Sequence, residues 1–524
     1  MNTPNDLSQL SPDQLRQLAA SLLLQIEQVS RENLQQKQEV HYLKTLNEKL
    51  THEMVLLKRH RFGQRSEHLS QLQISLLDDA LDADVAAIET ELDELQQPVA
   101  EQAPARVRKP ARQPLPPELP RTNIHHEPDQ TLCGCGCQMK RIGEDVSEKL
   151  DYQPGVFSVE RHIRGKWVCN TCETLIQKPV DPHIIDKGMA SPGLLAQVLI
   201  AKYADHLPLY RQEQIFARAG VALSRSTLAE WVGACGVQLQ PLVDALQTLL
   251  LQQTVLHADE TPVPMLSPGK KKTHQAYIWA YATPTDAALN AVVYRFTPSR
   301  SGSHAREFLQ HWQGQLVCDD YGGYKESFRQ GVTEVGCMAH ARRKFVELHV
   351  SGKSQLAGEA VQLIQQLYAI EQQSREARLN ADQRLQLRQQ RSKPVADTLY
   401  AWMLAQRQKV PGNTATAEAL DYSLKRWTAL TRYLEDGQLP IDNNRVENLI
   451  RPWALGRSNW LFAGSLRSGQ RAANIMSRIQ SAKLNDNDPC AYLKDVLTKL
   501  PLWKSNRLEE LLPHRWQPPI SEQA

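Results

Sequence analysis

The stretch that decides the fold reads TVLHADETP at residues 254–262 and LVCDDYGG at residues 316–323. Both segments are rich in apolar and β-branched residues and run into a pair of acidic residues, which predicts strands that end at carboxylates. Asp259 and Asp319 are the first acids of the two pairs. An isolated aspartate at a strand end is usually a turn former, so the surrounding pattern has to be considered as well.

The segments around these two strands follow a definite order. They are, in turn, strands at 277–283 and 291–297, a helix at 303–312, a helix at 325–329 after the second acidic strand, and a strand at 333–338. Three strands, a helix, a strand, a helix and a strand is the order of a ribonuclease-H-like α/β fold. In that fold the first and fourth strands are neighbours, so their ends would bring Asp259 and Asp319 together.

A third carboxylate is expected from a helix that crosses these strand ends. Mg²⁺ prefers oxygen ligands and keeps several waters, so three carboxylates can hold two ions about 4 Å apart. The candidate is Glu447, in IDNNRVENLIRP at residues 441–452. Either Glu447 binds metal while Arg445 and Arg451 meet phosphates, or it forms a surface ion pair with Arg451. The residues alone do not choose among the acids, because three others compete: Glu260, Asp320 and Asp442.

Apolar residues recur every three and four positions across residues 12–60, which predicts a coiled coil. Asn33 and Asn47 fall on one seam position, where a buried polar residue favours a parallel dimer. One long helix folded back on its own chain is the alternative. We assign residues 1–70 to the coiled coil with its basic end, and residues 71–120 to an acidic segment and a proline-rich linker.

A cluster of cysteines predicts a zinc-binding β module at residues 121–180. Cys169 and Cys172 have C-x-x-C spacing, and three further cysteines precede a β-rich stretch, which suits a tetrahedral structural Zn²⁺. Cys133 and Cys135 are the preferred partners, although Cys137 competes with them. A redox role lacks its βαβ context, and an empty reduced cluster is the remaining alternative.

Residues 185–250 are expected to form a helical DNA-binding region. Residues 210–220 predict one helix that ends at a glycine, and residues 224–232 predict a second that Ser224 caps. Two short helices joined by such a turn have the outline of a helix-turn-helix, although helical hairpins without DNA contacts have the same outline. In a helix-turn-helix, the residues that face DNA would be Arg225, Ser226 and Thr227.

The composition is that of a soluble protein with several domains. The chain has 524 residues, of which 41% are hydrophobic and 23% charged. Its net charge of +3 gives no global sign of nucleic-acid binding, so any such sign must come from local clusters. We find no signal peptide and no apolar stretch of membrane-spanning length, which together with the scattered cysteines outside the cluster predicts a cytoplasmic protein without a membrane partner.

Motifs along nearly the whole chain resemble those of the bacterial insertion-sequence-66 family of DDE transposases. In the central part they are HADETP at 257–262, DDYGGY at 319–324, GCMAHARRKF at 336–345, DNNRVENLIRP at 442–452 and GRSNWLFAGS at 456–465. Towards the two ends they are RFGQRSE at 61–67, RIGEDV at 141–146 and LLPHRW at 511–516. Their order along the chain makes the resemblance specific.

The resemblance implies a multidomain α+β protein whose catalytic acids are Asp259, Asp319 and Glu447. Asp319 is preferred to Asp320 because the family's aspartate opens the tyrosine-glycine motif. The family pattern divides the second half into a catalytic core at 251–345, a helical insertion at 346–438, a catalytic helix segment at 439–482 and a tail at 483–524.

The resemblance further implies an enzyme that hydrolyses and transesterifies DNA phosphodiester bonds with two Mg²⁺ (or Mn²⁺) ions, beside a structural Zn²⁺. Its partners would be double-stranded DNA at the element ends and target, a second copy through the coiled coil, and accessory transposition proteins. Arg342 and Arg343 could line the DNA channel, whereas for His340 a structural hydrogen bond and a phosphate contact are both open. A catalytically inactive DNA-binding regulator and a host nuclease of the same fold are the alternative functions.

Overall fold

The computed structural model describes most of the chain after residue 114 and little before it. The described residues are 28, 42–44, 46, 47, 49–51, 53, 54, 83–89, 91, 115, 117, 119–132, 134, 137–153, 155–185, 188–266, 273–352, 354–460 and 462–518. The chain divides into one compact unit made of residues 1–64 and 88–107 and another made of residues 65–87 and 108–524.

In the first unit, Leu50 and Ile88 are buried against Leu46 and Met54. The described residues between 42 and 54 are helical. Most of the predicted coiled coil, including Asn33, lies outside the described residues, so pairing with a second chain stays a prediction. The acidic segment and the proline-rich linker lie mostly outside the described residues as well.

The predicted β module contains a long antiparallel hairpin. Its strands are β1 (Arg121–His126), β2 (Lys140–Gln153), β3 (Val156–Val168) and β4 (Leu175–Ile176). The order is β1-β3-β2, with β4 paired to β3, and only the β1–β3 pairing is parallel. Gly155 lies in the hairpin turn with φ +87°, a conformation that favours glycine. The β-rich stretch between the two cysteine groups is therefore confirmed as a strand.

Four helices follow the β module, as the sequence predicts for residues 185–250. They are α3 (Pro192–Tyr203), α4 (Leu209–Arg218), α5 (Arg225–Gln238) and α6 (Gln240–Leu250). Gly220 has φ +85° in the turn between α4 and α5, and the Ser224 hydroxyl accepts a hydrogen bond from the Thr227 backbone N–H. Ser224 is thus the N-cap of α5, as expected.

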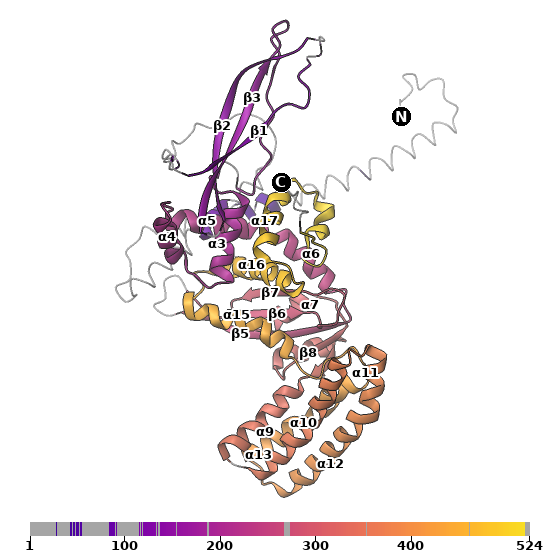
Figure 1. Ribbon diagram of the computed structural model, residues 1–524. Coiled ribbons are helices and arrows are strands. Elements are labelled where there is room, and N and C mark those ends of the chain that lie inside the picture. The colour runs from indigo at the N-terminus through magenta and orange to yellow at the C-terminus, as the bar shows by residue number, and fades with distance from the viewer. Residues whose placement is uncertain are drawn as a thin grey trace, which may run out of the picture. The chain divides into compact units, whose positions relative to one another are not determined.

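A mixed five-stranded sheet forms the centre of this unit (Figure 1). Its strands are β5 (Val255–Met265), β6 (His274–Ala282), β7 (Val292–Thr297), β8 (Gln315–Cys318) and β9 (Thr333–Gly336), in the order β7-β6-β5-β8-β9. The β5–β6 and β6–β7 pairs are antiparallel, whereas β5–β8 and β8–β9 are parallel. Helices α7 (Gly302–Leu309) and α8 (Lys325–Arg329) connect the strands. The expected order of elements and the pairing of the first and fourth strands are both present.

The outer edge of β7 is covered by α16 (Leu466–Leu484). The backbone N–H groups of Val292 and Tyr294 donate to the hydroxyls of Ser481 (3.1 Å) and Ser477 (2.9 Å). An uncovered sheet edge would expose unpaired backbone groups, so these serines close the sheet on this side.

Between β9 and α15 (Asn444–Trp460) the chain forms the expected helical insertion. It contains α9 (Met338–Gly352), α10 (Gln355–Glu376), α11 (Ala381–Leu387), α12 (Lys393–Lys409), α13 (Ala415–Lys425) and α14 (Trp427–Thr431), and a π-helical turn joins α11 to α12. These helices share a second apolar core with Val255, Val317 and Val335 of the sheet. The insertion therefore packs on one face of the sheet and begins in the helix that directly follows β9.

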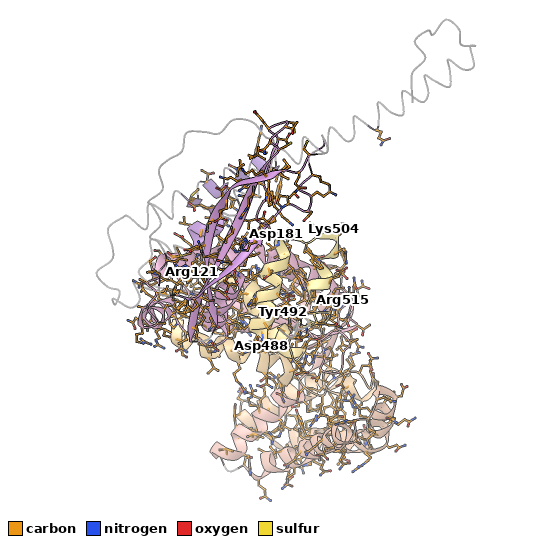
Figure 2. The ribbon with its side chains drawn as sticks, turned by 45° about the horizontal axis from the view of Figure 1, so that its top comes forward. Arg121, Asp181, Asp488, Tyr492, Lys504 and Arg515 are labelled. Atoms are coloured by element: carbon orange, nitrogen blue, oxygen red, sulfur yellow. The ribbon has the colours of Figure 1, made fainter. Side chains whose placement is uncertain are left out.

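The C-terminal part packs back on the helical region. Helix α17 (Pro489–Lys499) contacts α3 and α16, and its Tyr492 hydroxyl donates to the Leu511 carbonyl at 3.0 Å (Figure 2). Among the described residues, no helix is long and apolar enough to span a membrane.

Candidate functional site

The parallel pairing of β5 and β8 sets the positions of the first two acids. Val255 pairs with Gln315 and His257 with Val317, a constant offset along both strands. Two residues beyond the last pair, the same offset brings Asp259 opposite Asp319. Asp319 directly follows the end of β8, whereas Asp259 lies inside β5, which continues to Met265 paired with β6. The predicted pairing of the two strands is confirmed, but the prediction that the first strand ends at Asp259 is wrong.

The pKa of Asp259 reflects its burial and the carboxylates around it. Burial, the charge of Glu260 and the charges of Asp319 and Glu447 together raise the pKa of Asp259 to about 8, although the Glu260 backbone N–H donates to Asp259 Oδ1 at 2.8 Å and acts in the opposite direction. Carboxylates of like charge at such a site disfavour ionisation unless a cation offsets the repulsion.

Asn443 fixes the start of α15 beside β5. Its side chain is buried; Nδ2 donates to the Ala258 carbonyl at 2.9 Å and Oδ1 lies 2.8 Å from His257 Nδ1. Its backbone N–H donates to Cys337 Sγ at 3.2 Å. Burial lowers the pKa of His257 to about 4, so the imidazole is neutral and donates its Nδ1–H to the amide oxygen. These bonds bring the first turn of α15, with Glu447, to the part of β5 that precedes Asp259.

Glu447 is held by residues of α9. The Arg343 guanidinium donates to Glu447 Oε2 at 3.2 Å, and His340 Nδ1 lies 3.6 Å from Glu447 Oε1. Arg451 is exposed, and the described residues contain no ion pair between it and Glu447. The structure therefore does not show the surface ion pair between Glu447 and Arg451 that the sequence left as the alternative.

The competing acids Glu260 and Asp320 have cationic partners within the protein. The Glu260 side chain is 1% exposed and accepts from the Arg300 guanidinium at 2.6 and 2.8 Å and from the Tyr324 hydroxyl at 2.9 Å. Burial raises the pKa of Glu260, and Arg300 opposes that shift. Asp320 lies 2.9 Å from Lys325 Nζ and 3.3 Å from Arg426, whereas Asp319 Oδ1 accepts the Tyr321 backbone N–H at 2.9 Å.

The predicted DNA-binding arginines have different surroundings. The Arg445 guanidinium donates to the Thr283 carbonyl at 2.6 Å, to Thr285 at 3.2 Å and to the Asn290 side chain, so it ties α15 to the segment between β6 and β7. Arg342 is half-buried and Arg343 is exposed but engaged with Glu447.

On α5, the Arg225 side chain lies 3.7 Å from Glu213 of α4, and Ser226 and Thr227 are partly exposed beside it. None of these contacts tests binding to DNA, so the assignments of Arg225, Ser226, Thr227, Arg342, Arg343, Arg445 and Arg451 to DNA contacts stay predictions.

In the β module, Cys137 approaches the C-x-x-C turn. Its sulfur accepts a hydrogen bond from the Thr171 hydroxyl at 3.3 Å, and Thr171 lies between Cys169 and Cys172. Cys169 is buried and Cys172 is exposed. The preferred ligands Cys133 and Cys135 lie outside the described residues, so the choice among the first three cysteines stays open.

One cluster was missed at the sequence level. Cys337, His340 and Glu447 form a group whose ligand atoms all lie within 4.8 Å of one another. Burial raises the pKa of the Cys337 thiol to about 12 and lowers that of His340. The C-x-x-H spacing inside GCMAHARRKF was the signal that could have found it, because three residues make nearly one helical turn.

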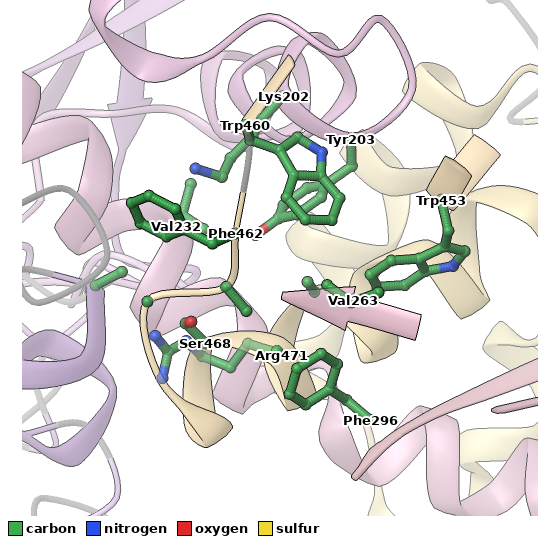
Figure 3. Close-up of a pocket in the computed structure, with 15 residues that line it drawn as sticks. Lys202, Tyr203, Val232, Val263, Phe296, Trp453, Trp460, Phe462, Ser468 and Arg471 are labelled. Carbon is green, nitrogen blue, oxygen red and sulfur yellow. The ribbon is translucent and has the colours of Figure 1, made fainter. Parts of the chain in front are cut away.

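A separate cavity lies between α3, α5, α15 and α16 and contains none of the proposed acids. Its walls carry the rings of Tyr203, Trp453, Trp460 and Phe462, and Arg471 lines it beside them (Figure 3). Arg471 also forms a buried ion pair with Asp84.

Comparisons with known proteins agree with the motifs. The sequence model described as Transposase IS66 family matches residues 187–471. Three others match flanking parts: Transposase C of IS166 homeodomain at 49–124, zinc-finger binding domain of transposase IS66 at 130–173, and IS66 C-terminal element at 477–514.

Full-length relatives are similar as well. The uncharacterized protein y4jD of Sinorhizobium fredii is 37% identical over 503 residues, which cover 92% of this chain and 97% of that protein. The uncharacterized protein y4qI of the same organism is 35% identical over 496 residues, which cover 91% and 90%. A mixed α/β protein with a zinc-finger segment and these matches falls in the class of DNA-binding transposases. The chain belongs to the Transposase IS66 family.

Proposed function

We propose that the protein is the transposase of a bacterial insertion sequence that binds the terminal inverted repeats of its element and cuts and joins DNA strands. Asp259, Asp319 and Glu447 are the proposed ligands of two Mg²⁺ ions, with Mn²⁺ as a substitute. The observation that carries this proposal is the parallel register of β5 and β8, which brings Asp259 opposite Asp319. The strand order, with three antiparallel strands followed by two parallel ones, supports a ribonuclease-H-like fold for this domain.

The donor set fits a hard divalent cation. Asp259 and Asp319 have no cationic side chain bonded to them among the described residues, whereas Glu260 and Asp320 are paired with Arg300, Lys325 and Arg426. A cation at Asp259 would offset the repulsion that raises the pKa of this carboxyl group. This contrast favours Asp259 over Glu260 and Asp319 over Asp320 as metal ligands.

Two bound Mg²⁺ ions would activate water or a 3′-hydroxyl and stabilise the leaving oxygen of the phosphodiester. The protein's own residues do the positioning. Asn443 and His257 hold the start of α15 against β5, and Arg343 orients the Glu447 carboxylate. Arg451 is exposed one turn further along α15, where a guanidinium could contact a phosphate.

The other segments supply binding and assembly in this proposal. A structural Zn²⁺ is held by Cys169 and Cys172 with two of the three earlier cysteines, and the hydrogen bond from Thr171 favours Cys137 as one of them. Helices α4 and α5 contact DNA as a helix-turn-helix. The N-terminal coiled coil pairs two copies, and accessory transposition proteins complete the reaction in the cytoplasm.

A cleavage assay tests the proposal. The full-length protein is incubated with duplexes that contain the element ends or a scrambled sequence, with Mg²⁺ or with EDTA. We expect Mg²⁺-dependent cutting of the end-containing duplex, and its loss in Asp259→Asn, Asp319→Asn and Glu447→Gln. Asp320→Asn is the matched control and should keep cutting.

Other outcomes identify the alternatives. Intact cleavage in all three acid variants would refute the proposed site. Salt-sensitive binding without metal-dependent cleavage would indicate a DNA-binding regulator. Cutting that ignores the end sequence would indicate a nuclease of the same fold.

A further inference from the structure

The side chains of Cys337, His340 and Glu447 form a second group of metal ligands beside the proposed acids. We propose that these three residues bind a zinc-type cation, and that occupation of this site withholds Glu447 from Asp259 and Asp319. The first half of the inference stands on the geometry of the three side chains alone. The second half, that such a cation inhibits strand cleavage, rests on the proposed function.

The spacing of the ligand atoms is that of a chelate. His340 Nδ1 and Glu447 Oε1 lie 3.6 Å apart, and the three ligand atoms lie within 4.8 Å of one another. Two ligands that each lie about 2.1 Å from Zn²⁺ at a tetrahedral angle are about 3.4 Å apart. The separation of His340 Nδ1 and Glu447 Oε1 is therefore close to that of two ligands of one Zn²⁺ ion.

The two facing atoms of His340 and Glu447 lack other partners. Both are shielded from solvent, and within the described part of the chain neither has a hydrogen-bond partner. A buried polar atom without a partner is costly, so native proteins rarely leave one unsatisfied. A cation between the two atoms would satisfy both at once, and the Arg343 guanidinium already occupies the other oxygen of Glu447.

Two backbone donors would stabilise the Cys337 thiolate once a cation has replaced its proton, although burial by itself opposes the charge. Cys337 directly precedes α9, and the backbone N–H groups of Asn443 and His340 both donate to its sulfur. Amide donors and a helix N-terminus stabilise negative charge on sulfur. The C-x-x-H spacing places the sulfur and the imidazole on the same turn of chain, while Glu447 approaches from α15.

The chemistry of the donors selects the cation. Thiolate and imidazole ligands favour Zn²⁺ over Mg²⁺, which prefers oxygen alone. Three protein ligands leave a fourth position for water or a phosphate oxygen. Glu447 would then have one oxygen on the cation and the other on Arg343, so this carboxylate would be less available as a ligand of ions at Asp259 and Asp319.

A zinc count tests the site without any need for activity. Metal-free full-length protein is dialysed against Zn²⁺ and its bound zinc is measured for the wild type, Cys337→Ser and His340→Gln. We expect the wild type to bind one equivalent more than either variant, because the cysteines of the β module contribute equally to all. Cys235→Ala, which removes a buried cysteine of α5, is the control and should match the wild type.

Cobalt provides a second readout on the same proteins. With Co²⁺, the sulfur-to-metal absorption should be weaker in Cys337→Ser than in the wild type and in Cys235→Ala. If Cys337→Ser does not fold, the zinc count of His340→Gln still tests the proposed site. Equal zinc counts and equal cobalt spectra in all folded variants would overturn the site.

Inhibition by Zn²⁺ tests whether the second site and the proposed Mg²⁺ site compete for Glu447. Zn²⁺ is titrated into the Mg²⁺-dependent cleavage reaction, and each protein is normalised to its own rate without added zinc. We expect His340→Gln to need at least about tenfold more Zn²⁺ for half-inhibition than the wild type. If the zinc count confirms the site but the wild type and His340→Gln are equally sensitive to Zn²⁺, competition for Glu447 is refuted. Absence of cleavage in the wild type would refute the proposed function and leave the zinc count standing.

Discussion

The surroundings of Asp259 in the central sheet and the core of the helical insertion treat buried charged groups in opposite ways. At the sheet, Asp259 is buried near other carboxylates, and its pKa rises to about 8. In the insertion, the buried Arg388 guanidinium makes two hydrogen bonds to the Glu371 carboxylate, at 2.7 and 2.8 Å, and others to the carbonyls of Tyr433 and Leu439. Asp259 has no cationic side chain bonded to it among the described residues, whereas Arg388 and Glu371 neutralise each other.

This difference distinguishes buried charged groups that stabilise the fold from those expected to bind a ligand. A buried ion pair whose polar atoms are all bonded belongs to the scaffold, and breaking it exposes an uncompensated charge. Buried carboxylates that repel each other are retained where a ligand balances them, and perturbed groups of this kind gather at functional sites. We therefore expect substitutions of the proposed acids to remove activity, and substitutions in the core of the insertion to remove stability.

The largest effect is expected at Asp259. Asp259→Asn should lower the rate of Mg²⁺-dependent end cleavage at least about a thousandfold, equivalent to about 4 kcal/mol of activation free energy, because a metal ligand is lost. Its melting temperature should equal or exceed that of the wild type, because folding of the variant no longer requires a buried carboxyl group to take up a proton. A large fall in melting temperature would show that Asp259 is part of the scaffold.

The same variant should change the pH dependence of stability. The folded pKa of about 8 lies above the unfolded pKa of about 4, so between these values the folded state keeps a proton that the unfolded state has lost. Without added Mg²⁺, the free energy of unfolding of the wild type should therefore fall as pH rises through this window. Denaturant titrations at several pH values should show a shallower fall in Asp259→Asn.

The next largest effect is expected at Arg388, on stability. Arg388→Met should lower the free energy of unfolding by about 3–5 kcal/mol, because Glu371 is left buried without its partner. The double variant Arg388→Met with Glu371→Leu should recover most of this loss, since it removes both charges. Urea unfolding followed by circular dichroism measures both proteins. A loss below about 1 kcal/mol in the single variant would contradict the role assigned to this pair.

Substitution of Asn443 is expected to affect both stability and activity. Asn443→Ala should cost about 1–3 kcal/mol of stability, because His257 and the Ala258 carbonyl lose a buried partner. It should also lower the cleavage rate, because the first turn of α15 is no longer held at β5. Asn443→Asp keeps the size of the side chain but removes the N–H donor to Ala258. Unchanged stability in both variants would show that other contacts hold α15 in place.

The smallest effect is expected at Asp320. Its side chain is 42% exposed, and solvent screens its pairs with Lys325 and Arg426. Asp320→Asn should change the free energy of unfolding by less than about 1 kcal/mol and leave cleavage within a few-fold of the wild type. A thousandfold loss of cleavage would instead assign the second metal ligand to Asp320.

Local patterns in the sequence were enough to predict the elements of the central sheet. Segments rich in β-branched and aromatic residues predicted the five strands. The order of strands and helices, taken as that of a ribonuclease-H-like fold, predicted that the first and fourth strands are neighbours. The Ser224 cap and the glycine turn before α5 were predictable too, because capping and left-handed turns depend on residues a few positions apart.

Contacts between distant segments were beyond such patterns. Nothing near Glu447 in the sequence indicated that Arg343 and His340 would hold it, or that Arg445 would bond to the connection between β6 and β7. Family motifs supplied the choice of Asp319, and the structure adds that Asp320 is paired with cations.

The sequence by itself determined the strands, the helices, the cysteine groups and the motifs of the Transposase IS66 family, because each depends on short-range periodicity or on residue identity. Only the tertiary structure decided that Asn443 anchors α15 to β5, and that Cys337, His340 and Glu447 converge. The physical reason is that burial and hydrogen bonding act on the partners that folding brings together. These partners come from the end of β9, the start of α9 and the start of α15, and the helical insertion separates them along the chain.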